Sequence, residues 1–230
     1  MALVGLFFSR GALELMGTPD NVLDLAVLYM RIYFIGMPVN MLYNFRLMAV
    51  AGENGIAAYG VIMYVNFVFS SMYIGYSIGA APIVSYHYGA GNRTELKNLL
   101  KKSLGLIGLT GLVLTALAEI TSGPLVEIFV GYDRELFEMT CHGFRIYALF
   151  FIICGFNIWS SAFFTALGNG VVSATISFLR TLVFQSGAVM LLPIFLGLDG
   201  VWLAVVAAEI MALCVSAIFC VAQRKKYGYL

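Results

Sequence analysis

The chain has 230 residues and a formal net charge of +1; 61% of its residues are hydrophobic and only 11% are charged. Its mean hydropathy is +0.93, whereas soluble domains average about 25% charged residues. These values exclude an ordinary soluble domain, and the balanced charge argues against a nucleic-acid partner. The composition therefore predicts an all-α polytopic membrane protein that is surrounded by membrane lipid.

Six stretches with few charged residues predict about six transmembrane helices, because a hydrocarbon core of roughly 30 Å needs about 20 apolar residues of helix. The clearest stretch, 54–86, contains no Asp, Glu, Lys or Arg. A short apolar segment at 1–9 comes before the helices and is interrupted by Arg10. In chain order, the helices are expected near 22–48, 55–86, 98–121, 135–166, 171–195 and 198–222.

The charged residues between the helices indicate how the chain is oriented. Segment 93–102 has four basic residues against one acid, and the tail adds three basic residues at 224–226. The loop 119–138 holds five acids against Arg134. Because basic segments stay in the cytoplasm, we expect a cytoplasmic C-terminus and an outward-facing acidic loop. Within that loop, PLVEIFVG at 124–131 is either a short interfacial helix that begins at its proline or an ordinary turn.

Two ionisable residues lie deep inside predicted helices, where insertion costs about 2.5–3.5 kcal/mol each, so both are candidate site residues. Counted from the turn at Gly197, Glu209 lies 12 residues along one helix and Arg180 lies 17 residues back along the other. At 1.5 Å per residue the axial offset is about 7 Å, which a guanidinium group can nearly span. We therefore expect an ion pair. This ion pair has two possible roles: Glu209 could couple transport to a proton or cation, or the pair could simply join two helices. The structural role is favoured, because a carboxylate with a positively charged partner stays ionised and does not easily exchange protons.

Uncharged polar and aromatic residues at depth form a second group of candidates. Such residues can line a cavity for a hydrophobic cation through hydrogen bonds and cation–π contacts. Hydrogen bonds between helices explain them equally well. The candidates for substrate contact in this group are Asn157, Gln185, Asn66, Tyr64 and Tyr76.

Proline and glycine residues indicate where helices bend or pack closely. Pro82, with Gly79 before it, is expected to kink or loosen the long second helix and is a candidate hinge. Gly105, Gly108 and Gly111 recur at a spacing of three on the following helix. This spacing predicts close packing of helices rather than a ligand site.

Motifs of catalytic, nucleotide-binding and metal sites are absent from the sequence. It contains no HExxH, no GxxxxGK[ST] and no set of Ser, His and Asp at depth. The four cysteines fall inside predicted helices without a CxxC pair, so we expect them to be packing residues. We therefore expect no enzymatic activity, no bound metal and no resident cofactor.

A weak internal repeat is visible at a shift of 114 residues. This shift aligns Asp24 with Glu138 and the Arg-Ile-Tyr at 31–33 with the Arg-Ile-Tyr at 145–147, without a gap. Duplicated helical halves are common in secondary transporters, whose substrate lies near the bilayer midplane between the repeats. Chance matches between apolar helices are the alternative explanation.

Four segments carry a family resemblance: AGENGIAAYG at 51–60, IGYSIGAAPIVSYHYGAGN at 74–92, FTALGNG at 164–170 and GLDGVWLAVVAAE at 197–209. They resemble the second lobe of the multidrug and toxin extrusion (MATE) transporters. The resemblance implies one lobe of a fold with twelve helices in two six-helix lobes around a central cavity. It also implies an antiporter of the bacterial inner membrane that exports cationic or amphipathic drugs in exchange for Na⁺ or H⁺.

The chain also departs from the family pattern. Residues 1–46 resemble helices three and four of the first lobe, whereas 47–230 resemble the second lobe, so about two and a half helices are missing between them. If the five downstream helices keep the direction that their charges favour, Asp20 and Asp24 are cytoplasmic, which reverses the orientation of the fourth helix in the family. The family's coupling acids have no counterpart here except Glu53, near the outer end of its helix.

Because one lobe supplies half a cavity, a homodimer or a complementing lobe is the expected partner. Two alternatives remain. One is a truncated or recombined membrane protein that transports nothing. The other is a flippase for lipid-linked oligosaccharides, which would need a cavity rich in Arg and Lys to hold pyrophosphate.

Overall fold

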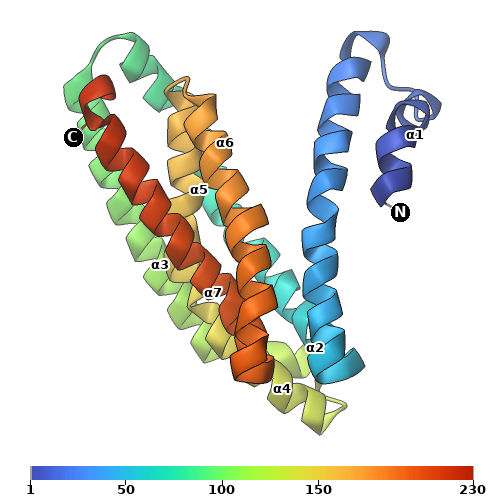
Figure 1. The fold of residues 1–230 in the computed structure, drawn as a ribbon. Coiled ribbons are helices and arrows are strands. Elements are labelled where there is room, and N and C mark those ends of the chain that lie inside the picture. The colour runs from blue at the N-terminus through green and yellow to red at the C-terminus, as the bar shows by residue number, and fades with distance from the viewer. Residues whose placement is uncertain (1, 230) are drawn as a thin grey trace.

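The computed structural model describes residues 2–229, without the side chains of 2–7, 20, 21, 25, 28, 29 and 31–40. The 31–33 half of the internal repeat lies outside these described side chains. Every element of the described chain is a helix, which confirms the all-α class. Figure 1 shows the elements α1 (Ala2–Leu15), α2 (Asp20–Gly89), α3 (Arg93–Val130), α4 (Arg134–Ala148), α5 (Phe150–Ala166), α6 (Gly170–Phe178), the π-helix η1 (Leu179–Gln185) and α7 (Ser186–Tyr227).

Two glycines fold the longest helices back on themselves. Gly52 (φ 61°, ψ −150°) interrupts α2, and Gly197 (φ 55°, ψ −130°) interrupts α7. A positive φ is open to glycine because it has no Cβ atom. Figure 1 shows the chain reversing at both places, at the end of the bundle opposite the C-terminus. The resulting six legs are 20–51, 53–89, 93–130, 134–166, 170–196 and 198–227.

Three stretches of the described residues are long and apolar enough to cross a membrane: 41–89, 93–130 and 170–227. The pair of α4 and α5, bent by 45°, makes up to four. The first and third stretches far exceed the roughly 20 residues of one span, and each contains a reversal at glycine. Each of the six expected helices lies within one leg, so the expected polytopic architecture is confirmed.

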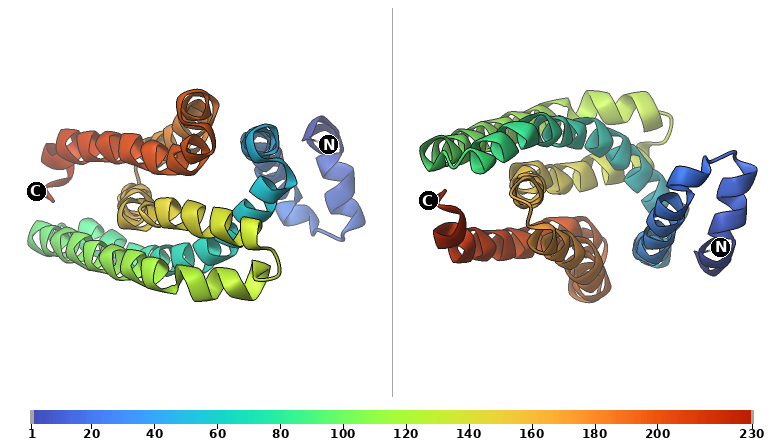
Figure 2. Two further views of the ribbon diagram at one scale, coloured as in Figure 1. Left: turned by 90° about the horizontal axis from the view of Figure 1, so that it is seen from below. Right: turned by 90° about the horizontal axis from the view of Figure 1, so that it is seen from above.

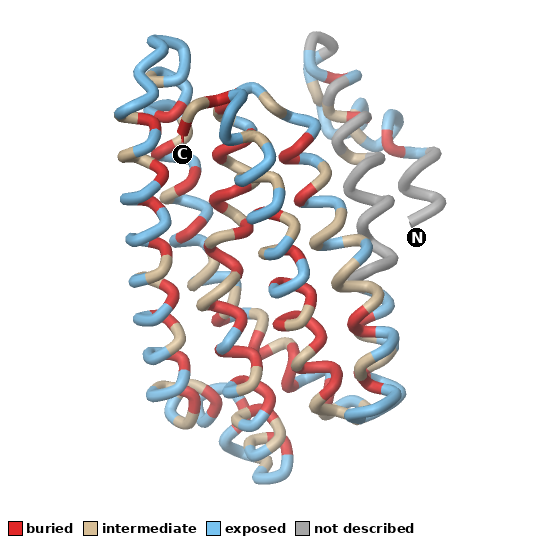
Figure 3. The backbone as a smooth tube through the Cα atoms, turned by 60° about the vertical axis from the view of Figure 1, so that its left-hand side comes forward, coloured by how far each residue is buried: buried red, intermediate tan, exposed pale blue. Residues whose placement is uncertain are grey.

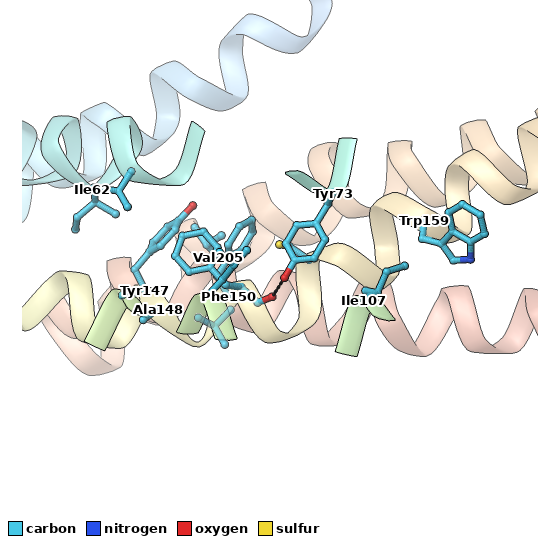
Figure 4. Close-up of a cluster of buried hydrophobic side chains, with 14 of the residues drawn as sticks. Ile62, Tyr73, Ile107, Tyr147, Ala148, Phe150, Trp159 and Val205 are labelled. Atoms are coloured by element: carbon cyan, nitrogen blue, oxygen red, sulfur yellow. Dashed lines mark hydrogen bonds between the residues drawn. The ribbon is translucent and has the colours of Figure 1, made fainter. Parts of the chain in front are cut away.

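Helix α5 forms the centre of the bundle and packs against α2, α3, α6 and α7, as Figure 2 shows. Its large side chains, such as Phe151 and Trp159, are buried. Two buried tyrosines bridge neighbouring legs: the Tyr73 hydroxyl donates to the Phe151 carbonyl (2.8 Å, Figure 4), and the Tyr43 hydroxyl donates to the Val201 carbonyl (2.7 Å). These bonds matter because a buried hydroxyl without a partner is costly.

The outward faces of the legs are apolar, whereas Figure 3 shows their buried residues turned toward the inside of the bundle. Helix α3 illustrates this arrangement. Its exposed leucines are Leu104, Leu106, Leu109, Leu112 and Leu117. An apolar surface of this extent is typical of contact with lipid or with another apolar partner.

Helix α3 continues through Pro124 to Val130, so both the separate interfacial helix and the turn expected at 124–131 are wrong. Proline removes the hydrogen bond that the residue 124 amide would donate to the Ile120 carbonyl, a loss that membrane helices tolerate. Helix α3 continues because the turn beyond the proline is packed in the bundle, where Val126 and Val130 are buried.

Helix α1 extends beyond the apolar segment 1–9 and includes Arg10, since arginine is a good helix former. The Arg10 guanidinium pairs with Glu14 (3.1 Å) in its own helix and with Asp24 (3.3 Å) at the start of α2. These contacts join α1 to α2.

The connections of the bundle gather at two opposite ends. Figure 1 places the α1–α2 connection, the α2–α3 connection and the C-terminus at one end. The turns at Gly52 and Gly197 and the α3–α4 connection lie at the other. Asp24 therefore lies at the same end as the basic segments 93–102 and 224–226, in agreement with the expected arrangement.

The three regularly spaced glycines of α3 differ in how closely other atoms approach them. A Cβ atom at Gly111 would lie 3.1 Å from the Ile152 Cα atom and 3.1 Å from the Phe151 carbonyl oxygen, both backbone atoms of α5. At Gly108 the nearest atom, from the Phe156 ring, is 3.4 Å away. At Gly105 there is no described atom within 4 Å. Close helix packing is thus confirmed at Gly111 but not at Gly105.

We expect Gly111→Ala to lower the thermal unfolding midpoint in detergent, because the α5 backbone must shift and overpacking costs about 1–3 kcal/mol. Gly105→Ala is the matched control, since it makes the same change in helix propensity in open space. The comparison uses the fluorescence of the buried tryptophans during heating. Equal midpoints for the two variants would contradict this account of the α3–α5 contact.

Candidate functional site

The carboxylate of Glu209, in the second half of α7, is the deepest charged group of the described chain. Its side chain is 5% exposed, and its Oε1 atom accepts a hydrogen bond from Arg180 Nε at 2.7 Å. The Arg180 side chain comes from η1 and is 22% exposed. The ion pair predicted from the axial offset of the two residues is therefore present in the structure.

Asn157, from the central helix α5, completes the site. Its Nδ2 atom donates to the second carboxylate oxygen of Glu209 (2.7 Å) and also to the Glu209 backbone carbonyl (3.0 Å). The Ser216 hydroxyl, two turns beyond Glu209 on α7, donates to Asn157 Oδ1 (3.0 Å). Both oxygens of the buried carboxylate thus have a donor, as a buried charge requires.

The site joins three elements that are distant in the sequence, namely α5, η1 and α7. Arg180 is the second residue of the seven-residue π-helix η1. A π-helix is rare, and it occurs frequently at functional sites because its wider turn changes the direction of side chains. The local backbone at Arg180 is therefore unusual at the position where the chain contacts its buried carboxylate.

The chemistry open to this cluster follows from its charges. Between Arg145 and Asp199 the sequence has one ionisable Asp, Glu, Lys or Arg residue, which is Arg180. The carboxylate and the guanidinium neutralise each other, and Asn157 and Ser216 add no charge. A proton or cation that binds Glu209 must therefore compete with Arg180 for Oε1 or with Asn157 for the other carboxylate oxygen.

The other polar candidates lie elsewhere. The Tyr76 hydroxyl donates to Ser103 Oγ (2.8 Å), and its ring packs on the Trp159 ring (5.4 Å between centroids). Asn66 accepts from the Ser70 hydroxyl (3.0 Å) one turn further along its own helix. Both hydrogen bonds are made within the protein, as expected if these residues stabilise the helices rather than contact a substrate.

Tyr64 and Gln185 also lie away from the ion pair. Tyr64 is 68% exposed and stacks on Phe129 (5.9 Å) at the rim of a shallow groove of about 570 Å³ between α2 and α3. Gln185 ends η1 and is half-buried, without a hydrogen bond from its side chain to any other described residue. The structure therefore brings together Glu209, Arg180 and Asn157 but not the remaining candidates.

The candidate hinge lies beside an apolar groove. Helix α2 stays helical through Gly79 and Pro82, and its only non-helical residue is Gly52. Pro82 lines a groove of about 560 Å³ between α2 and α5. The Ser85 hydroxyl, from the same stretch, donates to the Ala166 carbonyl at the end of α5 (2.8 Å). A hinge role stays a prediction.

Sequence reasoning missed two polar contacts. One is Ser216, whose position seven residues after Glu209 places it on the same helix face and could have indicated it. The other is the contact of His142 Nε2 with Asp199 Oδ1 (2.8 Å), which links α4 to the turn after Gly197.

Among the residues that the structure describes, no group of three or more His, Cys, Asp or Glu side chains could hold a metal ion.

A bundle of apolar helices around a buried ion pair defines a multi-pass integral membrane protein. The chain belongs to the MatE family, whose profile matches residues 39–188, more than half of its length. This is a family of membrane transporters and not of enzymes, as the sequence led us to expect. No curated protein sequence matches the chain.

Solved MATE structures share the fold. A MATE family multidrug resistance transporter of the MOP superfamily matches in its inward-facing form with a TM-score of 0.81 at 19% identity, over 92% of this chain and 50% of that one. The outward-facing form gives 0.79 at 18% identity, over 93% and 49%. The transporter VcmN of Vibrio cholerae, in its bent form, gives 0.77 at 18%, over 93% and 50%. The chain thus spans about half the length of these transporters.

We expect Arg180→Gln to lower the free energy of unfolding by about 3–5 kcal/mol, because Glu209 then stays buried without its charged partner. Glu209→Gln should cost less, since the Arg180 side chain is partly exposed. The double variant should recover part of the loss. Thermal unfolding in detergent, followed by tryptophan fluorescence, measures all three.

The exposed pair of Arg134 and Glu138 has the same distance of 2.7 Å and is the matched control. Because an exposed ion pair contributes about 0–1 kcal/mol, Arg134→Gln should change stability little. If Arg180→Gln and Arg134→Gln shifted the unfolding midpoint equally, the buried ion pair would contribute no more to stability than the exposed one.

Proposed function

We propose that the chain is one lobe of a cation-coupled multidrug antiporter, which exchanges Na⁺ or H⁺ for cationic or amphipathic drugs across the inner membrane of a bacterium. Membership of the MatE family supports the transporter class. The observation that carries the coupling role is the buried carboxylate of Glu209, held between three helices by Arg180 and Asn157. An ionisable group at membrane depth is typical of ion-coupled transport.

A second lobe is part of this proposal, because the chain spans about half the length of the transporters that share its fold. An apolar groove of about 430 Å³ on η1 and α7, whose lining includes Phe184, Leu191 and Met211, supplies surface for such a partner. A second copy of the chain or a complementing lobe would close the cavity. Alternating access then follows from rocking one lobe against the other.

The coupling step that we propose is an exchange of partners at Glu209. A proton or Na⁺ that reaches the carboxylate replaces the positive charge of Arg180. The released guanidinium then moves with η1, which changes the packing of α6 and α7. A drug cation favours the state in which Glu209 is negative and unoccupied, so drug and coupling ion bind in alternation.

The domain boundary also belongs to this proposal. Residues 1–46 would derive from helices three and four of a first lobe, and 47–230 from a second lobe. The two parts meet near the reversal at Gly52, where Arg46 donates to the Met190 carbonyl (3.2 Å). Residue 46 is thus docked on α7 although it would come from the other lobe.

A flippase for lipid-linked oligosaccharides is less well supported. Such a protein needs free positive charges at depth to bind pyrophosphate. Arg180 is the basic residue at that depth, and Glu209 neutralises it. A protein that inserts but transports nothing is the remaining alternative, favoured by the absence of the family's usual coupling acids.

The deciding experiment is the accumulation of ethidium in efflux-deficient bacteria that express the chain. We expect lower accumulation than in cells without the chain, and loss of this effect in Glu209→Gln, which cannot bind a coupling ion as a carboxylate. The matched control is Glu138→Gln, which removes an exposed carboxylate that is also paired with an arginine. Membrane fractions must contain equal amounts of each variant.

The outcomes separate the alternatives. Export that Glu209→Gln abolishes and Glu138→Gln leaves intact supports a working oligomer with Glu209 as coupling group. Export that survives Glu209→Gln leaves the transporter but removes the coupling role. Normal insertion without export of the drug means that the chain alone is not a transporter.

A further inference from the structure

Positive charge is concentrated at one end of the bundle. The segments 86–102 and 221–230 hold seven Lys and Arg residues against one acid, Glu95, although the whole chain has a net charge of only +1. Figure 1 shows that these two segments lie together, where α3 begins and α7 ends. The Glu95 carboxylate is bound by Asn98 Nδ2 (3.3 Å). The net charge of these two segments is therefore strongly positive.

A polar cavity of about 190 Å³ lies between these segments. A water molecule's share of liquid volume is about 30 Å³, so the cavity has room for a phosphate group. It is lined from three directions, by the end of α2, the start of α3 and the end of α7. The lining residues are His87, Tyr88, Gly91, Asn92, Arg93, Leu96, Lys226 and Tyr227.

The basic side chains of this cavity are held by their neighbours. A Cβ atom at Gly228 would lie 2.6 Å from the Arg93 Cδ atom, so the arginine stem packs against the chain after α7. Lys226 Nζ lies 5.1 Å from the centroid of the Tyr227 ring. That ring meets the ring of Tyr88 edge-on at 5.4 Å, which joins α7 to the end of α2. These contacts hold the stems of two exposed basic side chains at the edge of the cavity.

His87 lines the cavity as well, although its Nδ1 atom is fully buried and therefore not open to a ligand there. The charged donors that the cavity offers are the Arg93 guanidinium and the Lys226 ammonium. Such charged donors form the strongest hydrogen bonds to phosphate oxygens.

We propose that this cavity binds the phosphate of an anionic phospholipid headgroup. Arg93 and Lys226 contact the phosphate oxygens. The acyl chains lie along an exposed apolar face close to the cavity, where Ile83 of α2 and Val221 of α7 are exposed about 6–8 Å along their helices from His87 and Lys226. A free phosphate ion would use the polar cavity but not this apolar face.

The site would hold the start of α3 to the end of α7 through a lipid bridge. Basic pockets between membrane helices on the cytoplasmic side are typical binding sites for anionic headgroups. The location is also independent of Glu209, so the inference does not rest on the proposed transport activity.

The test is native mass spectrometry of the full chain in non-ionic detergent, titrated with phosphatidylglycerol or phosphatidylcholine. We expect tighter binding of phosphatidylglycerol. The double variant Arg93→Gln/Lys226→Gln should weaken it by at least about tenfold, because two charge-assisted hydrogen bonds are lost. Both side chains are exposed, and size-exclusion chromatography checks that the variant stays folded.

The matched control is Lys101→Gln/Lys102→Gln, which makes the same change in net charge on the same helix outside the cavity. These lysines lie about 12 Å along α3 from Arg93, beyond the screening length of about 8 Å at physiological salt. Binding should therefore change by less than about twofold.

Three results would overturn the proposal. Equal affinity for the two lipids would exclude a headgroup site, and an equal loss in both double variants would mean diffuse attraction to the basic end. Displacement of phosphatidylglycerol by millimolar inorganic phosphate would identify the free ion as the ligand instead.

Discussion

The buried carboxylate of Glu209 imposes the strictest requirement on this fold. In an apolar bundle a charge is tolerated only while opposite charge and hydrogen-bond donors surround it. The donors here come from α5 and η1, so these elements must keep a fixed position relative to α7. Asn157 has a double role, because it binds both the carboxylate and the backbone of the helix that carries it. The central place of α5 gives this arrangement its rigidity.

Glycines set how closely the remaining legs approach this centre. At Gly111 the backbone of α3 touches that of α5, which brings the third leg against the core without a side chain between them. At Gly52 and Gly197 a positive φ lets the chain reverse within one residue, so that consecutive legs run side by side. Because the legs are apolar outside as well as inside, burial of hydrophobic surface alone cannot specify their arrangement in lipid. Close backbone contacts and the few polar bonds provide that specification.

Much of this architecture could be predicted from the sequence, since six stretches with few charged residues and the length of a membrane span determine the legs. The pair of Arg180 and Glu209 was also predictable, because two helices joined by a tight turn have a known axial offset. The partners of Asn157 were not, since the relation of α5 to α7 depends on tertiary packing. Pro124 was misjudged because the turn after it is held in the bundle by the buried side chains of Val126 and Val130, which depends on tertiary packing. The wide backbone of η1 leaves no mark on composition or hydropathy.

The π-helix has a consequence for how related chains should be compared. A π-turn takes up one more residue than an α-turn, because its hydrogen bonds run from residue i to residue i+5. Loss of one residue between 179 and 185 would therefore restore an unbroken α-helix and leave the flanking helix faces nearly unchanged. Only the side chains inside the wide turn, Arg180 among them, would change their direction relative to Glu209. Alignment gaps in this short segment therefore carry more information about ion binding than many substitutions elsewhere.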